Sequence, residues 1–93
     1  MGKVRKGRSV DAALCKKGFR CEEDSGHFFY ALPGSSVRTK ISHGMMGRDI
    51  GRELLGVMAK QLRLSFAQFL DLIDCPLDEA GYRAILRNSG FIL

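Results

Sequence analysis

The spacing of apolar residues changes twice before residue 65. Residues 9–17 and 49–62 carry apolar side chains at helical spacing, whereas residues 19–42 alternate apolar with polar side chains. Helical spacing gathers apolar side chains on one side of a helix, and alternation gathers them on one face of a strand. The pattern predicts a helix, a stretch of β-structure and a second helix, in that order.

The first predicted helix has signals at both ends. Ser9 is the expected N-cap, because its hydroxyl can accept a hydrogen bond from the first turn. Lys16 and Lys17 suit the carboxyl end of a helix, and the glycine that follows them, Gly18, commonly ends one. We therefore expect a short helix that ends just before Gly18.

The alternating region contains three strand segments, residues 19–22, 27–32 and 37–42, separated by the turn sequences EDSG and PGSS. β-Branched and aromatic residues favour strands, while Gly, Pro, Asp and Ser favour turns. The region is predicted to be a three-stranded antiparallel meander. A sheet this small needs a covering layer, which the two helices are expected to supply.

The turns define a predicted register and, with it, two faces of the sheet, because side chains alternate along a strand. The expected cross-strand pairs are Leu32 with Val37, Phe29 with Lys40, His27 with Ser42, Glu22 with His27 and Arg20 with Phe29. One face is expected to join the core through Phe19, Cys21, Phe28, Tyr30, Leu32, Val37, Thr39 and Ile41. The opposite face is expected to carry Arg20, Glu22, His27, Phe29, Arg38, Lys40 and Ser42.

Two further amphipathic helices are predicted after residue 64. Ser65 is the expected N-cap of one, and Pro76 followed by Asp78 indicates the start of the other. A chain of 93 residues is too short to form two independent cores. The expected fold class is α+β: residues 1–64 form a helix, three antiparallel strands and a helix behind a basic N-terminal arm, and residues 65–93 form a helical extension packed on the same core.

The composition is that of a folded protein, with 45% hydrophobic and 27% charged residues. The net charge of +5 is unevenly spread: residues 1–20 carry seven basic and one acidic side chain, and residues 65–93 carry two basic and four acidic ones. A basic N-terminal third favours a polyanionic partner such as nucleic acid, because Lys and Arg displace counterions from phosphates. A basic arm that only keeps the protein soluble is the alternative.

The sequence contains no apolar run long enough to span a membrane, and its first residues, MGKVRKGRS, lack the apolar centre of a signal peptide. We therefore predict a cytoplasmic protein with no membrane partner. Three cysteines, Cys15, Cys21 and Cys75, match no zinc framework, and we expect buried, reduced thiols. Adjacent carboxylates without suitably spaced histidines seldom form a metal site, so neither a metal nor another cofactor is expected.

The polar face of the predicted sheet contains His27, the residue with the clearest chemistry. An imidazole titrates near neutral pH and can take or give a proton. On the same face Arg20, Arg38 and Lys40 are suited to hold a phosphate, and Phe29 is suited to stack on an unpaired base. The alternative is a face without a catalytic role, since an exposed sheet face is usually polar.

Over roughly residues 9–64 the sequence resembles the HicA family of toxin ribonucleases from bacterial and archaeal toxin–antitoxin modules. The matching motifs are KKGF after the first helix, SGHFFY at the second strand and T-x-I-S-H at the end of the third. The family's catalytic histidine corresponds to His27, and its second histidine to His43. Ser25 and Gly26 precede His27 in the reverse of the family's Gly-Ser order.

The resemblance implies a fold like that of double-stranded-RNA-binding domains, with both helices on one face of the sheet. It also implies a metal-independent endoribonuclease that cleaves messenger RNA and is neutralised by a HicB-type antitoxin. With His27 as the catalytic candidate, the candidate RNA-binding residues are Arg20, Ser25, Gly26, Phe29, Arg38, Lys40, Ser42 and His43.

Residues 65–93 extend past the minimal domain of that family. A homodimer formed through these C-terminal helices is a further expectation. Two other functions stay open on the sequence alone: a non-catalytic RNA-binding domain that uses the same basic face, and a small domain that binds a protein partner.

Overall fold

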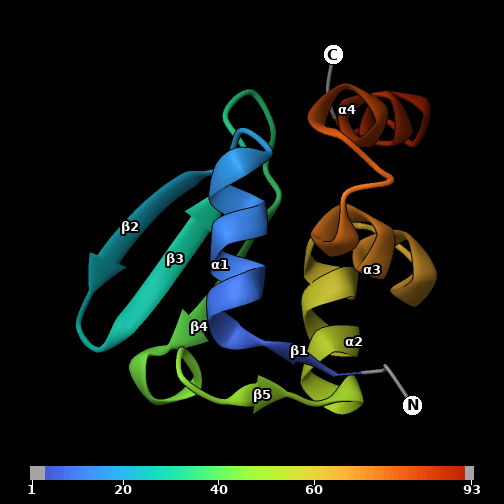
Figure 1. Ribbon diagram of the computed structural model, residues 1–93. Helices are drawn as coiled ribbons and strands as arrows, with labels where there is room; N and C mark the ends of the chain where they lie inside the picture. Colours follow the sequence, from blue (N-terminus) through green and yellow to red (C-terminus); the bar gives the residue numbers. More distant parts are fainter. Residues whose placement is uncertain (1–3, 92–93) are drawn as a thin grey trace.

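The order of the secondary-structure elements agrees with the predicted α+β class. The computed structural model describes residues 4–91 and contains helices, a three-stranded antiparallel sheet and a two-stranded one (Figure 1). The elements are β1 (Arg5–Lys6), α1 (Gly7–Lys16), β2 (Arg20–Asp24), β3 (His27–Ala31), β4 (Arg38–Ser42), the short 3-10 helix η1 (His43–Met45), β5 (Asp49–Ile50), α2 (Arg52–Gln61), α3 (Phe66–Asp74) and α4 (Glu79–Asn88). Within residues 4–91, no helix combines the length and the apolar character needed to cross a membrane.

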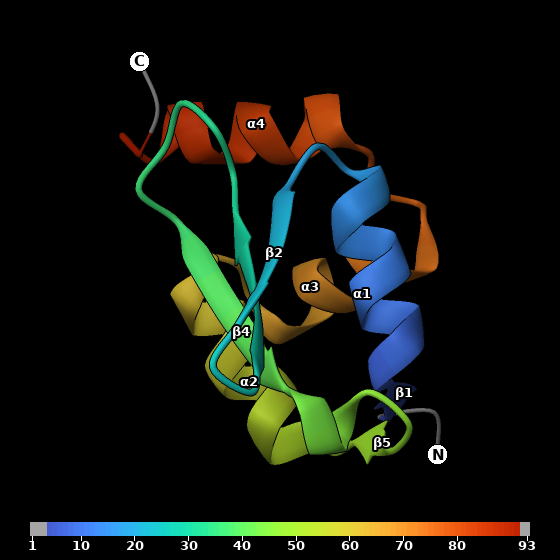
Figure 2. The same cartoon turned by 90° about the vertical axis from the view of Figure 1, so that its left-hand side faces the viewer.

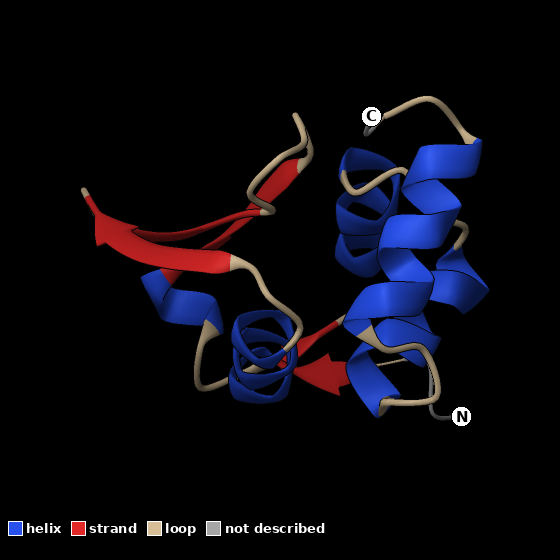
Figure 3. Cartoon of the chain, turned by 90° about the horizontal axis from the view of Figure 1, so that it is seen from above, coloured by secondary structure: helices blue, strands red, loops and turns tan. Residues whose placement is uncertain are grey.

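The three-stranded sheet has the order β2-β3-β4 and lies against helices on one face. α1 contacts β2, α2 contacts β4, and α3 contacts both of those helices. In Figure 2, α2 and α3 lie behind the strands, and Figure 3 shows the three long strands together at one side of the molecule. The side chains on the other face of the sheet are exposed or half-buried. We call this second surface the open face.

A single hydrophobic core lies between the sheet and the helices, and it includes residues from before and after residue 65. Its largest fully buried side chains are Leu14, Tyr30, Leu32, Ile41, Ile50, Leu55, Met58, Leu62, Phe69, Leu72, Tyr82 and Leu86. Burial of a large apolar side chain stabilises the folded state by about 1.5–3 kcal/mol. The two C-terminal helices therefore contribute to the same free energy of folding as the sheet.

The helix α4 is tied to the rest of the protein by polar and aromatic contacts. The Tyr82 hydroxyl donates a hydrogen bond to the Leu62 carbonyl oxygen (2.8 Å), and burial raises the pKa of this phenol. Its ring stacks on that of Phe19, with 5.8 Å between centroids. The ammonium of Lys17 donates to the Leu77 carbonyl oxygen (2.6 Å), just ahead of α4. The segment that joins α1 to β2 thus holds the start of the last helix in place.

The predicted N-cap Ser65 and the predicted start of the last helix at Asp78 are confirmed. The Ser65 hydroxyl accepts from the backbone N–H of Gln68, whose side chain accepts in turn from the backbone N–H of Ser65, so α3 starts with a capping box. The Asp78 carboxylate accepts from the backbone N–H of Gly81 at the start of α4 (2.8 Å). The prediction for Ser9 is wrong: α1 begins at Gly7 with Lys6 as an N-cap that makes no side-chain hydrogen bond.

The sequence pattern does not predict the short ladder between β1 and β5. This ladder explains why α1 starts earlier than expected. Gly7 donates its backbone N–H to the Arg48 carbonyl oxygen (2.8 Å), and a Cβ on Gly7 would collide with the backbone of Met45. Asp49 pairs with Lys6 in this ladder. The prediction that residues 49–62 are helical is therefore corrected: α2 begins at Arg52, because the residues before Gly51 are extended.

The predicted register is confirmed for one pair of strands and wrong for the other. Between β3 and β4, Phe29 lies opposite Lys40 as expected. Between β2 and β3 the register differs by two residues, so Asp24 rather than Glu22 lies opposite His27. A shift of two residues returns every side chain to the same face. The residues predicted on each face therefore stay on that face, while the neighbours of His27 change.

The register of β2 and β3 follows from a turn of two residues. Ser25 (φ 50°) and Gly26 (φ 83°) both have left-handed backbone conformations, as a type I′ hairpin turn requires. The expected four-residue EDSG turn is therefore wrong, because Asp24 still pairs within the ladder. Glycine adopts this conformation without steric cost, but serine does so with strain.

We expect Ser25→Asn to stabilise the protein by up to about 1 kcal/mol, because asparagine tolerates the left-handed region better than serine. The gain is measured as a higher midpoint of guanidinium unfolding with an unchanged m-value. Ser36→Asn is the matched control, since Ser36 is also an exposed turn residue but is not among those with positive φ. An equal gain in both variants would contradict the backbone explanation.

The cysteines differ from expectation. Cys15 of α1 and Cys21 of β2 form a disulfide, with their Cα atoms 6.0 Å apart, and Cys75 is free and exposed. The prediction of buried, reduced thiols is wrong because the chain turns at Gly18 (φ 92°), just after α1, so that β2 lies beside the last turn of the helix. The prediction that Cys21 joins the core is also wrong, since every residue of β2 is exposed.

Candidate functional site

The open face carries nine side chains in three cross-strand rows. The rows are Arg20, Ala31 and Arg38; then Glu22, Phe29 and Lys40; then Asp24, His27 and Ser42. The structure therefore brings together six of the predicted site residues on one surface. It adds Ala31 of β3, opposite Arg38, and Asp24, which the predicted β2 register had left in a turn.

Charge is divided across the open face. The border strand β4 contributes Arg38 and Lys40, both exposed, whereas the opposite border strand β2 contributes Glu22 and Asp24. In the first row the small side chain of Ala31 lies between two arginines. An anionic ligand is consequently attracted to the β4 side and to the arginine end of the face, and repelled from the border formed by β2.

His27 lies in the last row and is half-buried. Its ring centroid is 5.9 Å from that of Phe29, with the planes tilted by 43°. Asp24 is opposite His27 in the ladder, and its carboxylate accepts a hydrogen bond from the Ser25 hydroxyl (3.2 Å). Ser42 lies opposite on the other side. The imidazole is thus flanked by an aromatic ring and by two oxygen-bearing side chains from neighbouring strands.

Tyr30 joins this part of the sheet to α1, on the face opposite to the open face. Its hydroxyl donates a hydrogen bond to the Asp11 carboxylate of α1 (2.6 Å), and its side chain is fully buried. Burial first, and then the hydrogen bond to Asp11, raise the pKa of this phenol. Since side chains alternate along β3, anchoring Tyr30 to the helix directs its neighbour Phe29 to the open face.

A shallow hollow of about 280 Å³ borders β4 beside Phe29. It is lined by Phe29, Arg38, Thr39, Lys40 and Gln61. Phe29 is 39% exposed, which is unusual for a large aromatic side chain on a cationic surface. The Thr39 hydroxyl donates to the Gln61 side-chain oxygen (2.6 Å) at the end of α2. Sequence reasoning missed Gln61, because only the packing of α2 against β4 brings it to this border.

His43 does not join His27. Its ring lies 4.6 Å from that of Phe28, and its Nε2 atom is 2.9 Å from a carboxylate oxygen of Glu23. Phe28 and His27 are successive residues of a strand and point to opposite faces, so His43 lies on the helix-bearing side of the sheet. Its backbone N–H donates to the Gly26 carbonyl oxygen (2.9 Å). This contact joins η1 to the β2–β3 turn.

The two other predicted RNA-binding residues, Ser25 and Gly26, lie at the tip of that turn. Both are exposed, and they connect Asp24 to His27, the two residues that pair at the end of the ladder. They therefore border the open face at its histidine end, opposite to the end that carries Arg20 and Arg38. Within residues 4–91, no group of three or more His, Cys, Asp or Glu side chains could hold a metal ion.

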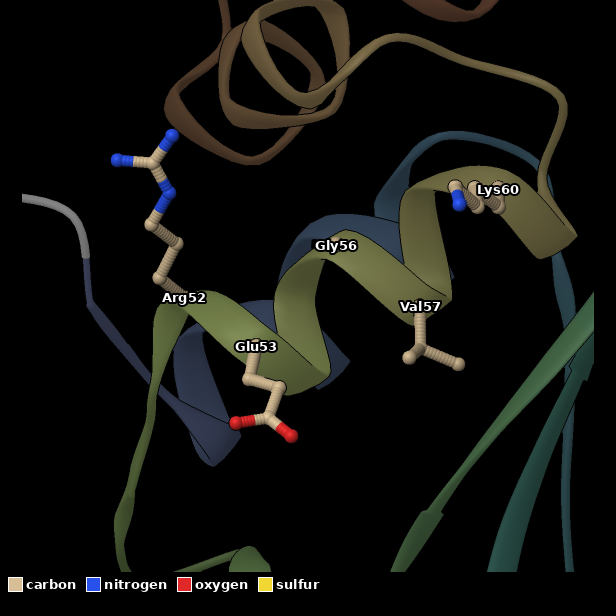
Figure 4. Close-up of a pocket in the computed structure, with 5 residues that line it drawn as sticks. All are labelled: Arg52, Glu53, Gly56, Val57 and Lys60. Atoms are coloured by element: carbon tan, nitrogen blue, oxygen red, sulfur yellow. The ribbon is translucent and has the colours of Figure 1, made fainter.

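A larger hollow, of about 580 Å³, lies on α2 and contains no such chemistry. Figure 4 shows Glu53 and Val57 projecting from the same side of the helix, with Gly56 leaving the surface bare and Arg52 and Lys60 at its two ends. The guanidinium of Arg52 lies over the ring of Phe66, 5.2 Å from its centroid. With no histidine, thiol or buried polar group in its lining, this hollow is a weaker candidate than the open face.

Comparisons with known proteins identify no relative. No protein-family model, no curated protein and no solved structure matches the chain. The function must therefore be argued from the site itself.

Proposed function

We propose that the protein is a metal-independent endoribonuclease of the HicA-like toxin type, with a fold like that of double-stranded-RNA-binding domains. The observation that carries the proposal is the open face, where His27 lies in the same sheet surface as an exposed aromatic ring and a cationic border strand. Messenger RNA is the proposed substrate, and a HicB-type antitoxin is the proposed inhibitor. The cytoplasm is the proposed location, and a homodimer through α3 and α4 remains part of the proposal.

The arrangement supports RNA cleavage by internal transesterification, in which a 2′-hydroxyl of the RNA itself attacks the neighbouring phosphate. His27 takes the proton from a ribose 2′-hydroxyl, whose oxygen attacks the adjacent phosphorus while the bond to the 5′-oxygen breaks and that oxygen takes a proton from water. Lys40 and Arg38 neutralise the charge that develops on the phosphoryl oxygens. Phe29 stacks on a neighbouring base and aligns the strand. The products are a 2′,3′-cyclic phosphate and a 5′-hydroxyl, and DNA is not cleaved because it lacks the attacking group.

A binding domain without catalysis is the second candidate function. One observation favours it: the imidazole of His27 makes no hydrogen bond to another residue of the described chain, so nothing holds one tautomer in place. Catalytic histidines are commonly oriented by such a bond. In this case Phe29 and the cations of β4 bind RNA, and His27 contributes only a contact.

The deciding experiment is incubation of the purified protein with an end-labelled single-stranded RNA in excess EDTA. The ribonuclease proposal expects cleavage in EDTA and fragments that end in a 2′,3′-cyclic phosphate. A matched RNA with a single 2′-deoxy substitution at the main cleavage site serves as the control and is expected to resist cleavage there. Cleavage that requires added metal, or that continues at the deoxy position, would contradict the mechanism.

RNA binding is expected to depend on Lys40 and on salt. Replacing Lys40 with alanine removes one phosphate contact, so the slope of log K against log salt concentration should fall by about 0.7 for a single strand. The measurement is a fluorescence anisotropy titration at several salt concentrations. Arg87→Ala is the control, because it removes the same charge from α4 rather than from the open face. Equal slopes in the two variants would mean that RNA does not contact β4.

A further inference from the structure

The strand β4 forms a border of the three-stranded sheet, and its outer backbone groups are unpaired. Leu32 donates its backbone N–H to the Val37 carbonyl oxygen (3.3 Å), so Val37 directs its backbone groups toward β3. In an antiparallel pair this direction alternates along the strand. Thr39 therefore also faces β3, and Arg38 and Lys40 direct their N–H and C=O groups outward. No other residue of the described chain bonds to these outward groups.

The border at Arg38 and Lys40 is accessible. Both residues are exposed, and the hollow of about 280 Å³ lies directly along this part of the strand. Gln61, which also lines the hollow, accepts a hydrogen bond from the Thr39 hydroxyl. An unprotected strand border of this kind is a template for the addition of another strand.

The charges on β4 select the kind of strand that can be added. A new strand would place its side chains beside Arg38 and Lys40 on the open face, where carboxylates form favourable cross-strand pairs. Two copies of β4 are a poor match for each other, because antiparallel pairing centred on Lys40 sets like charges directly opposite. The residues between the carboxylates point to the opposite face, beside Thr39 and Gln61, which line the hollow.

We propose that β4 docks an extended acidic segment of a partner protein by main-chain hydrogen bonding, as a fourth strand of the sheet. The segment has Asp or Glu at alternate positions and covers Arg38, Lys40 and the hollow. Docking itself does not depend on catalysis. Its consequence rests on the proposed function: the segment would occupy the cationic border that RNA needs and so inhibit the protein.

The test uses a synthetic fluorescent peptide of seven residues that alternates glutamate with valine, and a second peptide N-methylated at the residues whose N–H groups would face β4. We expect saturable binding of the first peptide at concentrations up to about 1 mM. The N-methylated peptide should not bind, and hydrogen exchange at the amides of Arg38 and Lys40 should slow on addition of the first peptide only. Lys40→Glu should weaken binding by at least about tenfold, and Arg87→Glu, the same charge reversal on α4, should not.

Four outcomes would overturn the proposal. The first is that the folded protein does not bind the first peptide, and the second is that it binds the N-methylated peptide equally well. The third is that hydrogen exchange at the amides of Arg38 and Lys40 does not change. The fourth is that self-association alone protects these amides, with the acidic β2 of a second copy as the added strand. If N-methylation does not affect peptide binding and RNA displaces the peptide, the peptide is bound by charge alone and not by main-chain hydrogen bonds. The His27→Ala variant should bind the peptide normally, so docking and ribonuclease activity succeed or fail independently.

Discussion

Replacement of His27 by alanine is expected to reduce the rate of RNA cleavage by about a hundredfold to ten-thousandfold, the usual contribution of general acid–base catalysis. RNA affinity should change little, because the cations of β4 and the ring of Phe29 remain. The measurement is single-turnover cleavage of the labelled RNA in EDTA, with affinity determined separately by anisotropy. Half-burial of His27 beside Phe29 makes a fold check necessary, and circular dichroism supplies it.

His43→Ala is the matched control for that experiment. His43 lies near Phe28 and Glu23 on the other side of the sheet, so its loss should have a much smaller effect on the cleavage rate. A loss of rate at His43 equal to that at His27 would show that the open face alone is not the catalytic surface. Unchanged cleavage in His27→Ala, with a folded protein, would leave the protein as an RNA-binding domain or assign the activity to other residues.

Replacement of Phe69 by alanine is expected to lower the free energy of unfolding by about 3–5 kcal/mol, the cost of removing a buried aromatic side chain. Phe69 belongs to α3 and is fully buried in the core that the sheet shares. Guanidinium unfolding followed by circular dichroism measures the loss. Phe29→Ala is the control, because the same deletion at a 39% exposed position should cost far less.

The Phe69 variant tests whether residues 65–93 fold together with the sheet or as a separate unit. If residues 65–93 were an independent appendage, the loss of Phe69 would leave the unfolding of the sheet unchanged. A shared core instead predicts one cooperative transition at a lower denaturant concentration. Because about 5 kcal/mol is comparable with the stability of many domains of this size, Phe69→Leu, with a smaller expected loss, provides a measurable variant if the alanine protein is unfolded.

Much of the candidate site is predictable from local sequence. The turn PGSS and the alternation on either side of it are enough to place Phe29 opposite Lys40, and period two then places His27 and Arg38 on the same face. Ser65 and Asp78 start α3 and α4 for equally local reasons, since an N-cap bonds within its own first turn.

The neighbours of His27 are not predictable in the same way. The sequence EDSG is compatible with a turn of four residues or of two, and the choice decides whether Glu22 or Asp24 lies opposite His27. A serine followed by glycine is a weaker signal for a two-residue turn than asparagine or aspartate followed by glycine. The pairing of the two strands along their whole length outweighs the strain at Ser25.

The sequence by itself determined the α+β class, the two faces of the sheet and six of the site residues that share the open face. It could do so because apolar spacing of two residues in strands and of 3.6 residues in helices is a local property of the chain. Only the tertiary structure decided the β1–β5 ladder, the contact of His43 with Phe28 and Glu23, and the position of Gln61 beside β4. These features join segments far apart in the chain, and their free energy comes from burial and main-chain pairing that no local pattern encodes.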